Sequence, residues 1–173
     1  MCGDGCFFLV VLDSSVILQA LFEEEYTKEA RILLREADIV EVPAILEFEV
    51  GSGLTKLHRR KLLSQREAED YMRQFSGIPL KIVETDRERT LKIAIRTGLT
   101  FYDASYVDVA LRAESTIYTS DDALFERSKE FTSSFHLREM KDGHHKRERS
   151  DRISRSLLGG GGPPRRVFHR RAC

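Results

Sequence analysis

The sequence predicts an α/β fold in which a parallel β-sheet carries helices on both faces, in three α/β/α layers. Three observations support this prediction. Short strand-like segments alternate with amphipathic helical segments over residues 7–137. The first strand-like segment, FFLVVL at 7–12, is apolar throughout, as is typical of a buried parallel strand. Hydrophobic residues make up 41% and charged residues 32%, proportions of a soluble globular domain.

Each expected element follows from a local pattern. In the segment 28–37, Ala30, Leu33, Leu34 and Ala37 form one apolar face. The sequences SQRE (64–67) and TDRE (85–88) resemble capping boxes that begin helices, and Gly98 suits a helix end. Helices are expected at 14–22, 28–37, 44–57, 64–75, 85–96, 103–113 and 122–129, and strands at 7–12, 39–42, 80–83, 115–119 and 133–137.

Charge divides the chain into two parts. Residues 1–137 carry 17 Lys and Arg against 24 Asp and Glu, a net charge of −7, and we expect them to form one domain. Residues 138–173 carry 11 against 4, a net charge of +7, and include GGGGPP. We expect a basic, disordered tail there, which either contacts nucleic acid or is an incidental solvated extension.

Cellular location has only weak signals in this sequence. The longest apolar run, 6–12, is too short to span a bilayer, and no basic segment precedes it as in a signal peptide. The three cysteines lie near the termini and form no disulfide or zinc pattern. We therefore expect a cytoplasmic protein without a membrane partner.

Four acidic residues follow or open the expected elements. Asp13 and Asp121 follow the first and fourth strands, Asp103 opens a helix, and Glu49 lies in the helix after the second strand. Ligands of parallel sheets bind beyond the carboxyl ends of the strands, so these acids can converge there. Taken singly, each aspartate is equally an N-cap candidate, and helix geometry alone does not distinguish Glu49 from Glu47.

A convergence of carboxylates has a chemical consequence. Such groups repel one another unless cations neutralise them, and oxygen-only ligands favour Mg²⁺ or Mn²⁺. Because no His or Cys lies near these positions, zinc is disfavoured. Hard divalent ions held by carboxylates suit phosphoryl chemistry.

Four motifs in order carry a family resemblance: LVVLDSSVIL, VPAILEFEVGSGL, FYDASYVDVAL and TIYTSDDAL. Over residues 8–131 the chain resembles a PIN domain, and most closely the VapC-type toxins of prokaryotic toxin–antitoxin pairs. The resemblance implies a metal-dependent endoribonuclease that cuts RNA, with Mg²⁺ or Mn²⁺ as cofactor. It also implies a homodimer and a small antitoxin protein as partner.

The motifs assign roles by position. The D-x-S element at Asp13 implies a metal ligand, with Ser15 orienting the acidic cluster. The register of EVGSGL selects Glu49 over Glu47, and the YDASY element selects Asp103. All three acids are implied catalytic metal ligands.

The fourth implied catalytic metal ligand is Asp121, which lies in a T-x-D element supported by Thr119. The next residue, Asp122, is either an accessory acid or a residue of the first helical turn, where negative charge is favoured.

A basic segment, TKLHRRK at 55–61, follows Glu49 closely. It either binds the RNA backbone or is a solvated helix end. The RNA-binding candidates are Lys56, Arg59, Arg60 and Lys61. Phe101 and Tyr102 could stack on a base, but core packing is favoured for both. Gly51 and Gly53 permit close approach of another element, in docking or internal packing.

Three other functions compete with the nuclease. A non-catalytic PIN-fold protein that binds RNA or a partner would be expected to have lost acids, and all four are present. A phosphotransfer receiver would need an acidic pair after strand one and a late lysine. A haloacid-dehalogenase-like phosphatase would need a second aspartate where Ser15 stands. The metal-dependent ribonuclease is therefore favoured.

Overall fold

The sheet at the centre of the fold is parallel throughout. In the computed structural model, which describes residues 7–141, five strands lie in the order β3-β2-β1-β4-β5. The strands are β1 (Leu9–Leu12), β2 (Ile39–Pro43), β3 (Lys81–Val83), β4 (Thr116–Thr119) and β5 (Ser134–His136). The parallel sheet expected from the sequence is confirmed.

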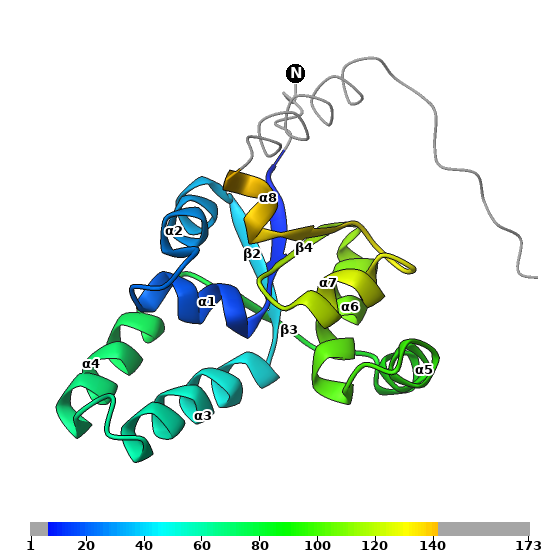
Figure 1. The fold of residues 1–173 in the computed structure, drawn as a ribbon. Helices are drawn as coiled ribbons and strands as arrows, with labels where there is room; N and C mark the ends of the chain where they lie inside the picture. Colours follow the sequence, from blue (N-terminus) through cyan, green and yellow to red (C-terminus); the bar gives the residue numbers. More distant parts are fainter. Residues whose placement is uncertain (1–6, 142–173) are drawn as a thin grey trace, which may run out of the picture.

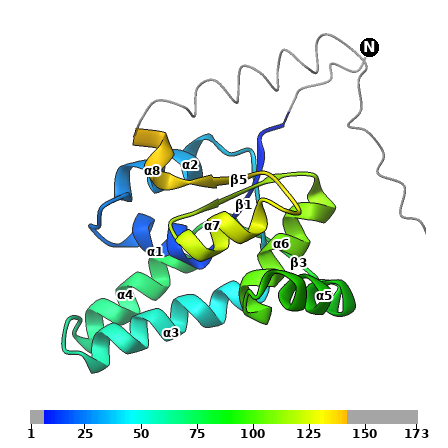
Figure 2. The same ribbon diagram turned by 45° about the vertical axis from the view of Figure 1, so that its right-hand side comes forward.

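Helices cover both faces of this sheet, which confirms the three-layer arrangement. Among the described residues they are α1 (Ser14–Leu21), α2 (Thr27–Glu36), α3 (Ile45–Arg59), α4 (Gln65–Ser76), α5 (Arg87–Thr97), α6 (Phe101–Ala113), α7 (Asp122–Ser128) and α8 (Leu137–Lys141). Helix α6 packs on β2, β1 and β4, while α1 packs on β1 and β4. The helices α3 and α4 form a hairpin that extends from the lower edge of the sheet (Figures 1 and 2).

The core follows from apolar strands packed against the apolar faces of helices. Val10, Val11 and Leu12 of the central strand are fully buried. Across the sheet they meet buried residues of the helices, among them Ile17 of α1 and Val107 of α6. The strongly apolar β1 therefore lies at the centre, as its composition requires.

The strand order reverses between β1 and β4, the position at which a parallel sheet can form a ligand crevice. The chain passes from β1 outward through β2 to β3, then returns to the other side of β1 with β4 and β5. At such a reversal, the loops after the two adjacent strands separate and leave room for a ligand. Asp13 directly follows β1 at this crevice, and Ser120 follows β4.

Several local expectations are confirmed and two are wrong. Ser64 begins α4 with a full capping box, and Gly98 ends α5 in the left-handed conformation at φ 69°. The expected capping box at Thr85 does not form, because Asp86 caps α5 instead. Asp103 does not begin its helix: Thr100 is the N-cap of α6, so Asp103 lies in the first turn.

The boundary expected between residues 137 and 138 falls inside a short helix, α8, which begins at buried Leu137. The rest of the expected basic tail, 142–173, lies outside the described residues. In the described part, no helix is long and apolar enough to cross a membrane.

Candidate active site

Asp13 is buried at the crevice and held by three hydrogen bonds. It caps α1 by accepting from the Val16 backbone N–H at 3.1 Å. The Ser15 hydroxyl donates to its Oδ1 at 2.7 Å, and the Thr119 hydroxyl donates to its Oδ2 at 2.7 Å. Both carboxylate oxygens are therefore fixed in direction by groups from β4 and α1.

The same hydroxyls position the loop that carries Asp121. Ser15 Oγ accepts from the Ser120 backbone N–H at 2.9 Å, and Thr119 Oγ1 accepts from the Asp121 N–H at 2.9 Å. Asp121 in turn caps α7 by accepting from Leu124 N–H. Its remaining oxygen receives no hydrogen bond within the described residues. Asp13 and Asp121 thus form one unit, which we name the strand pair.

Glu49 and Asp103 come from two different helices and form the helix pair. Glu49 of α3 accepts a short hydrogen bond from the Tyr106 hydroxyl of α6. Asp103 accepts from the Thr100 hydroxyl at 2.7 Å, and its N–H donates back to that oxygen at 3.1 Å. The negative charge of Asp103 acts on Glu49, so the two carboxylates are close enough to repel.

Burial and mutual repulsion disfavour ionisation at this site. Burial raises the pKa of Asp13 to about 6, against the hydrogen bonds from Ser15, Thr119 and Val16, and the charge of Asp121 adds to the rise. Burial, followed by the charge of Asp103, raises the pKa of Glu49, against the Tyr106 hydrogen bond. Burial is the largest cause of both shifts, and no cation among residues 7–141 is a cause of either.

Tyr106 lies between the two pairs. It is fully buried, and burial together with the charges of Glu49 and Asp13 raises its pKa. The sequence motifs did not single out Tyr106 as a site residue. Its position three residues after Asp103, on the same helical face, is a signal that could have identified it.

A metal-binding role fits the donor set of this site. None of the four acids forms an ion pair with a Lys, Arg or His among residues 7–141. In that range no three acidic, His or Cys side chains stand together as a preformed metal cluster. The two unneutralised pairs, with oxygen donors only, fit a hard divalent cation in chemistry and in charge.

The remaining predicted residues divide into different environments. Asp122 forms an ion pair with Arg138, and its Oδ1 lies 3.6 Å from Nε2 of buried His136. Lys56 lines the same hollow as Glu49 and Ser14. Arg59 instead lines a groove between α3 and α4.

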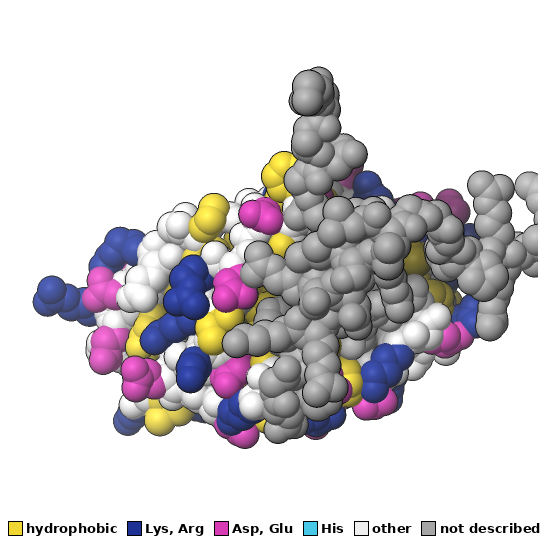
Figure 3. Space-filling view, turned by 90° about the horizontal axis from the view of Figure 1, so that it is seen from above, with side chains coloured by type: hydrophobic (Ala, Val, Ile, Leu, Met, Phe, Trp, Pro, Cys, Tyr) yellow, Lys and Arg dark blue, Asp and Glu magenta, His cyan; other side chains and the backbone are white. Residues whose placement is uncertain are grey.

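Two further basic candidates lie beyond α3: Arg60 is its C-cap, and Lys61 follows at a φ of 60°. The face at the opposite end of the sheet, seen in Figure 3, shows basic and acidic side chains intermixed on its described surface.

The small residues of α3 pack internally. A Cβ at Gly51 would meet Met72 of α4 at 3.5 Å, and one at Gly53 would meet Leu18 of α1 at 3.3 Å. The tight contact accounts for Gly53 by helix–helix packing, whereas the contact at Gly51 is of ordinary length and leaves docking and internal packing both open there.

Comparison with known proteins places this site in a family context. The family model of the PIN domain matches residues 10–130, which include all four acids. The chain belongs to the PIN domain family. A curated relative, Ribonuclease VapC3 of Pyrobaculum aerophilum, is 26% identical over 122 residues, covering 68% of this chain and 93% of the relative.

Solved structures show the same fold at low sequence identity. The crystal structure of PAE2754 from Pyrobaculum aerophilum has a TM-score of 0.62 and 20% identity, covering 76% of this chain and 85% of that one. DNA-bound VapBC from Salmonella typhimurium has a TM-score of 0.55 and 17% identity, covering 76% and 99%. The PIN fold expected from the sequence is thus confirmed.

Proposed function

We propose that this PIN-domain protein is a metal-dependent endoribonuclease, the toxin of a VapBC-type pair. The observation that carries the proposal is the presence of two unneutralised carboxylate pairs on either side of Tyr106, whose hydroxyl donates to Glu49 and whose pKa the charge of Asp13 also raises. The similarity to Ribonuclease VapC3 supports RNA as the substrate. Phosphodiester hydrolysis needs positive charge beside the reacting phosphate, and the acids themselves cannot supply it.

Asp13, Glu49, Asp103 and Asp121 would hold one or two Mg²⁺ or Mn²⁺ ions, directly or through water. When bound, such an ion would polarise water and phosphate oxygens and offset the charge that develops during hydrolysis. The chain's own contribution is placement. Asp13 is fixed at the sheet edge by two hydroxyls, whereas Glu49 is fixed from α6 by Tyr106.

RNA would approach along α3. Lys56 follows Glu49 by two helical turns, about 10 Å along the helix, and lines the same hollow. Its ammonium group can hold a backbone phosphate next to the acids. Arg59, Arg60 and Lys61 extend this charge toward the end of α3 and would add affinity that falls with salt concentration.

The groove between α3 and α4 is our proposed docking site for the antitoxin. It has a volume of about 560 Å³ and is lined by Phe48, Leu54 and Met72 among others. Phe48 exposes 69% of its surface, although it is a large apolar residue. An amphipathic antitoxin helix would cover Phe48 and shield the adjacent acids from RNA.

A homodimer is also proposed, with α5 as a contact. Leu91 and Ile95 lie one turn apart on this helix and are 51% and 75% exposed. Burial of such a stripe against a second copy would remove it from water. Light scattering should give a dimer mass for the wild type and a monomer mass for a Leu91→Lys/Ile95→Lys variant. A monomeric wild type would contradict the proposal.

The nuclease proposal is tested by cleavage of a pool of single-stranded and structured RNAs. We expect cutting by the wild-type protein with Mg²⁺ or Mn²⁺, and none in EDTA. The variant Asp103→Asn should lose the activity while retaining its melting temperature within a few degrees. Metal-independent cutting, or full activity of Asp103→Asn, would contradict the proposal.

A further inference from the structure

A second hollow adjoins the candidate active site. It has a volume of about 810 Å³ and lies where β2 and β3 end and α6 begins. Ile45 and Tyr102 line both this hollow and the one that contains Glu49 and Lys56. An RNA segment whose phosphate lies at Lys56 can therefore reach the second hollow without leaving the surface.

Aromatic side chains are exposed at this hollow. Phe101 exposes 43% of its surface and Tyr102 exposes 57%, although the sequence favoured core packing for both. They occupy the first turn of α6, where Thr100 caps the helix. Exposed rings beside a phosphate site suit the stacking of unpaired nucleobases.

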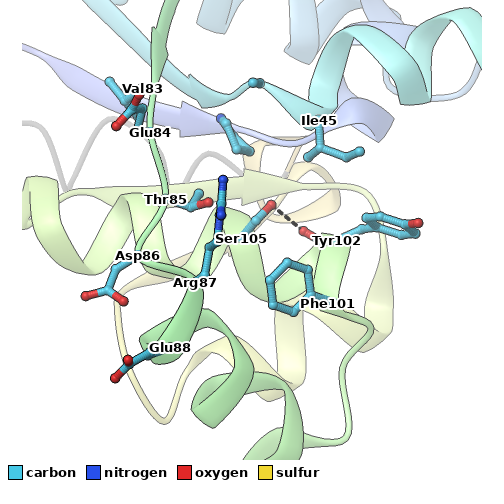
Figure 4. Close-up of a pocket in the computed structure, with 12 residues that line it drawn as sticks. Ile45, Val83, Glu84, Thr85, Asp86, Arg87, Glu88, Phe101, Tyr102 and Ser105 are labelled. Carbon is cyan, nitrogen blue, oxygen red and sulfur yellow. Dashed lines mark hydrogen bonds between the residues drawn. The ribbon is translucent and has the colours of Figure 1, made fainter.

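Arg87 supplies a free guanidinium at the same place. It is exposed and forms neither a hydrogen bond nor an ion pair with any residue between 7 and 141. Nearby arginines are engaged: Arg89 pairs with buried Asp108, and Arg112 donates to the Glu84 carbonyl. Figure 4 shows Arg87 extending into the hollow that Phe101 also lines.

Acidic residues surround this hollow without filling it. Glu84, Asp86 and Glu88 belong to its lining, and in Figure 4 the carboxylates of Asp86 and Glu88 point away from Arg87. These charges repel a phosphate backbone, whereas Arg87 repels a cationic peptide side chain. A neutral planar group that stacks between an aromatic ring and a guanidinium is repelled neither by the acidic residues nor by Arg87.

We propose that this hollow binds an unpaired nucleobase of the RNA, next to the backbone phosphate that Lys56 would hold beside the carboxylate pairs. The base stacks on Phe101, and the Arg87 guanidinium packs on it or contacts its edge. This inference rests on the proposed function, since it names a subsite of the same enzyme. It predicts that the protein prefers single-stranded RNA at its cutting position.

A fluorescence experiment tests the contact without cleavage. The chain contains no tryptophan, so Phe101→Trp places a single reporter in the hollow. The variant is titrated in EDTA with a single-stranded RNA and with an abasic oligomer of the same length. We expect the RNA to quench the fluorescence of the introduced indole and the abasic oligomer to leave it nearly unchanged.

Fluorescence anisotropy measures the affinity of matched variants for the same RNA, and this binding is the quantity compared. Phe101→Ala should weaken it about 5- to 100-fold, the range expected for loss of one stacked base, while Phe101→Tyr should retain it. Arg87→Ala should weaken it too. Arg66→Ala, an exposed arginine of α4 without an ion pair in the described part, should not.

Three results of the titration would overturn the inference: RNA binding without a response of the indole reporter, equal quenching by the abasic oligomer, or quenching by an arginine-rich peptide but not by RNA. Equal RNA affinity of Phe101→Ala and Phe101→Tyr would also overturn it. Because the titration needs no cutting, a catalytically inactive protein whose reporter still responds to RNA refutes only the nuclease proposal.

Discussion

The strand pair and the helix pair carry the same charges but are held in different ways. Asp13 is 4% exposed, sits at the end of a central strand and has both oxygens fixed by hydroxyls. Glu49 is half-buried on α3, and the Tyr106 hydroxyl that donates to it belongs to another helix. The sheet determines the position of a carboxylate at the end of a strand, whereas the position of a carboxylate on a helix depends on how that helix packs.

The consequence is a division of roles. Asp13 of the strand pair is buried at the end of a central strand, so its position should hardly change when a ligand binds, although its partner Asp121 is exposed. The helix pair joins α3 to α6 through the hydrogen bond between Glu49 and Tyr106, so its separation from the strand pair can adjust. In the described residues no three acids are clustered, which agrees with two separate pairs held by different elements.

The largest expected effect tests whether both pairs are needed. Asp13→Asn and Glu49→Gln should each reduce kcat/KM for RNA cleavage by about 100-fold or more, because each removes a charge from the site. The matched control is Glu47→Gln, which changes an exposed acid on the same helix. Loss of activity in Glu47→Gln but not in Glu49→Gln would reverse the assignment.

The pH dependence of stability should separate the buried acid from the exposed ones. The pKa of Asp13, about 6, lies above its ordinary value of 3.8, so the folded state holds this proton more tightly than the unfolded state. Stability in EDTA should therefore fall as the pH rises from about 4 to 6, by up to roughly 3 kcal/mol. Glu49 acts in the same direction.

Urea unfolding of the wild type and Asp13→Asn at several pH values checks this prediction. The variant should lose much less stability over this range, and Mg²⁺ or Mn²⁺ should stabilise the wild type at pH 7. Parallel pH profiles for the two proteins would show that burial of Asp13 does not control the effect.

The hydroxyl network of the strand pair should contribute measurably to folding. Thr119→Val removes a donor to Asp13 and an acceptor for Asp121 N–H, which should cost about 1–3 kcal/mol in free energy of unfolding. Thr90→Val is the matched control, because the buried Thr90 hydroxyl has no hydrogen-bond partner among the described residues. An equal loss of stability in both variants would contradict the role of the network.

The helix pair should respond to loss of a single hydroxyl. Tyr106→Phe removes the hydrogen bond that positions Glu49. The affinity for Mn²⁺ should therefore fall about 10-fold, as is typical when the hydrogen-bond partner of a metal ligand is removed. Tyr71→Phe, in α4, should leave it unchanged. Calorimetric titration measures both, and a Tyr106→Phe affinity equal to that of wild type would show that packing alone positions Glu49.

The sequence predicted the strand pair better than the helix pair, for a physical reason. Asp13 follows an apolar run, and its neighbours Ser15 and Thr119 stand in short motifs whose contacts are fixed by the sheet. Glu49 needed a family register to separate it from Glu47. The Tyr106 contact depends on how α3 and α6 pack, which the one-dimensional pattern does not contain.

Local capping produced the other differences. Thr85 and Asp86 are both good N-caps, and only the chain path after β3 selects Asp86. In the same way, Thr100 displaces Asp103 from the cap of α6 and leaves its carboxylate beside Glu49. The helix begins at Phe101, two residues before the start that the sequence predicted, and Phe101 and Tyr102 are both exposed in its first turn.

The strand pair and the helix pair should together form one divalent-metal centre. Titration of Mn²⁺ followed by electron paramagnetic resonance tests this directly, on wild type, Asp13→Asn and Asp103→Asn. We predict that either substitution weakens Mn²⁺ binding at the same site by about 10-fold or more. Mn²⁺ binding that is unchanged in one of these variants would show that its pair does not belong to the centre.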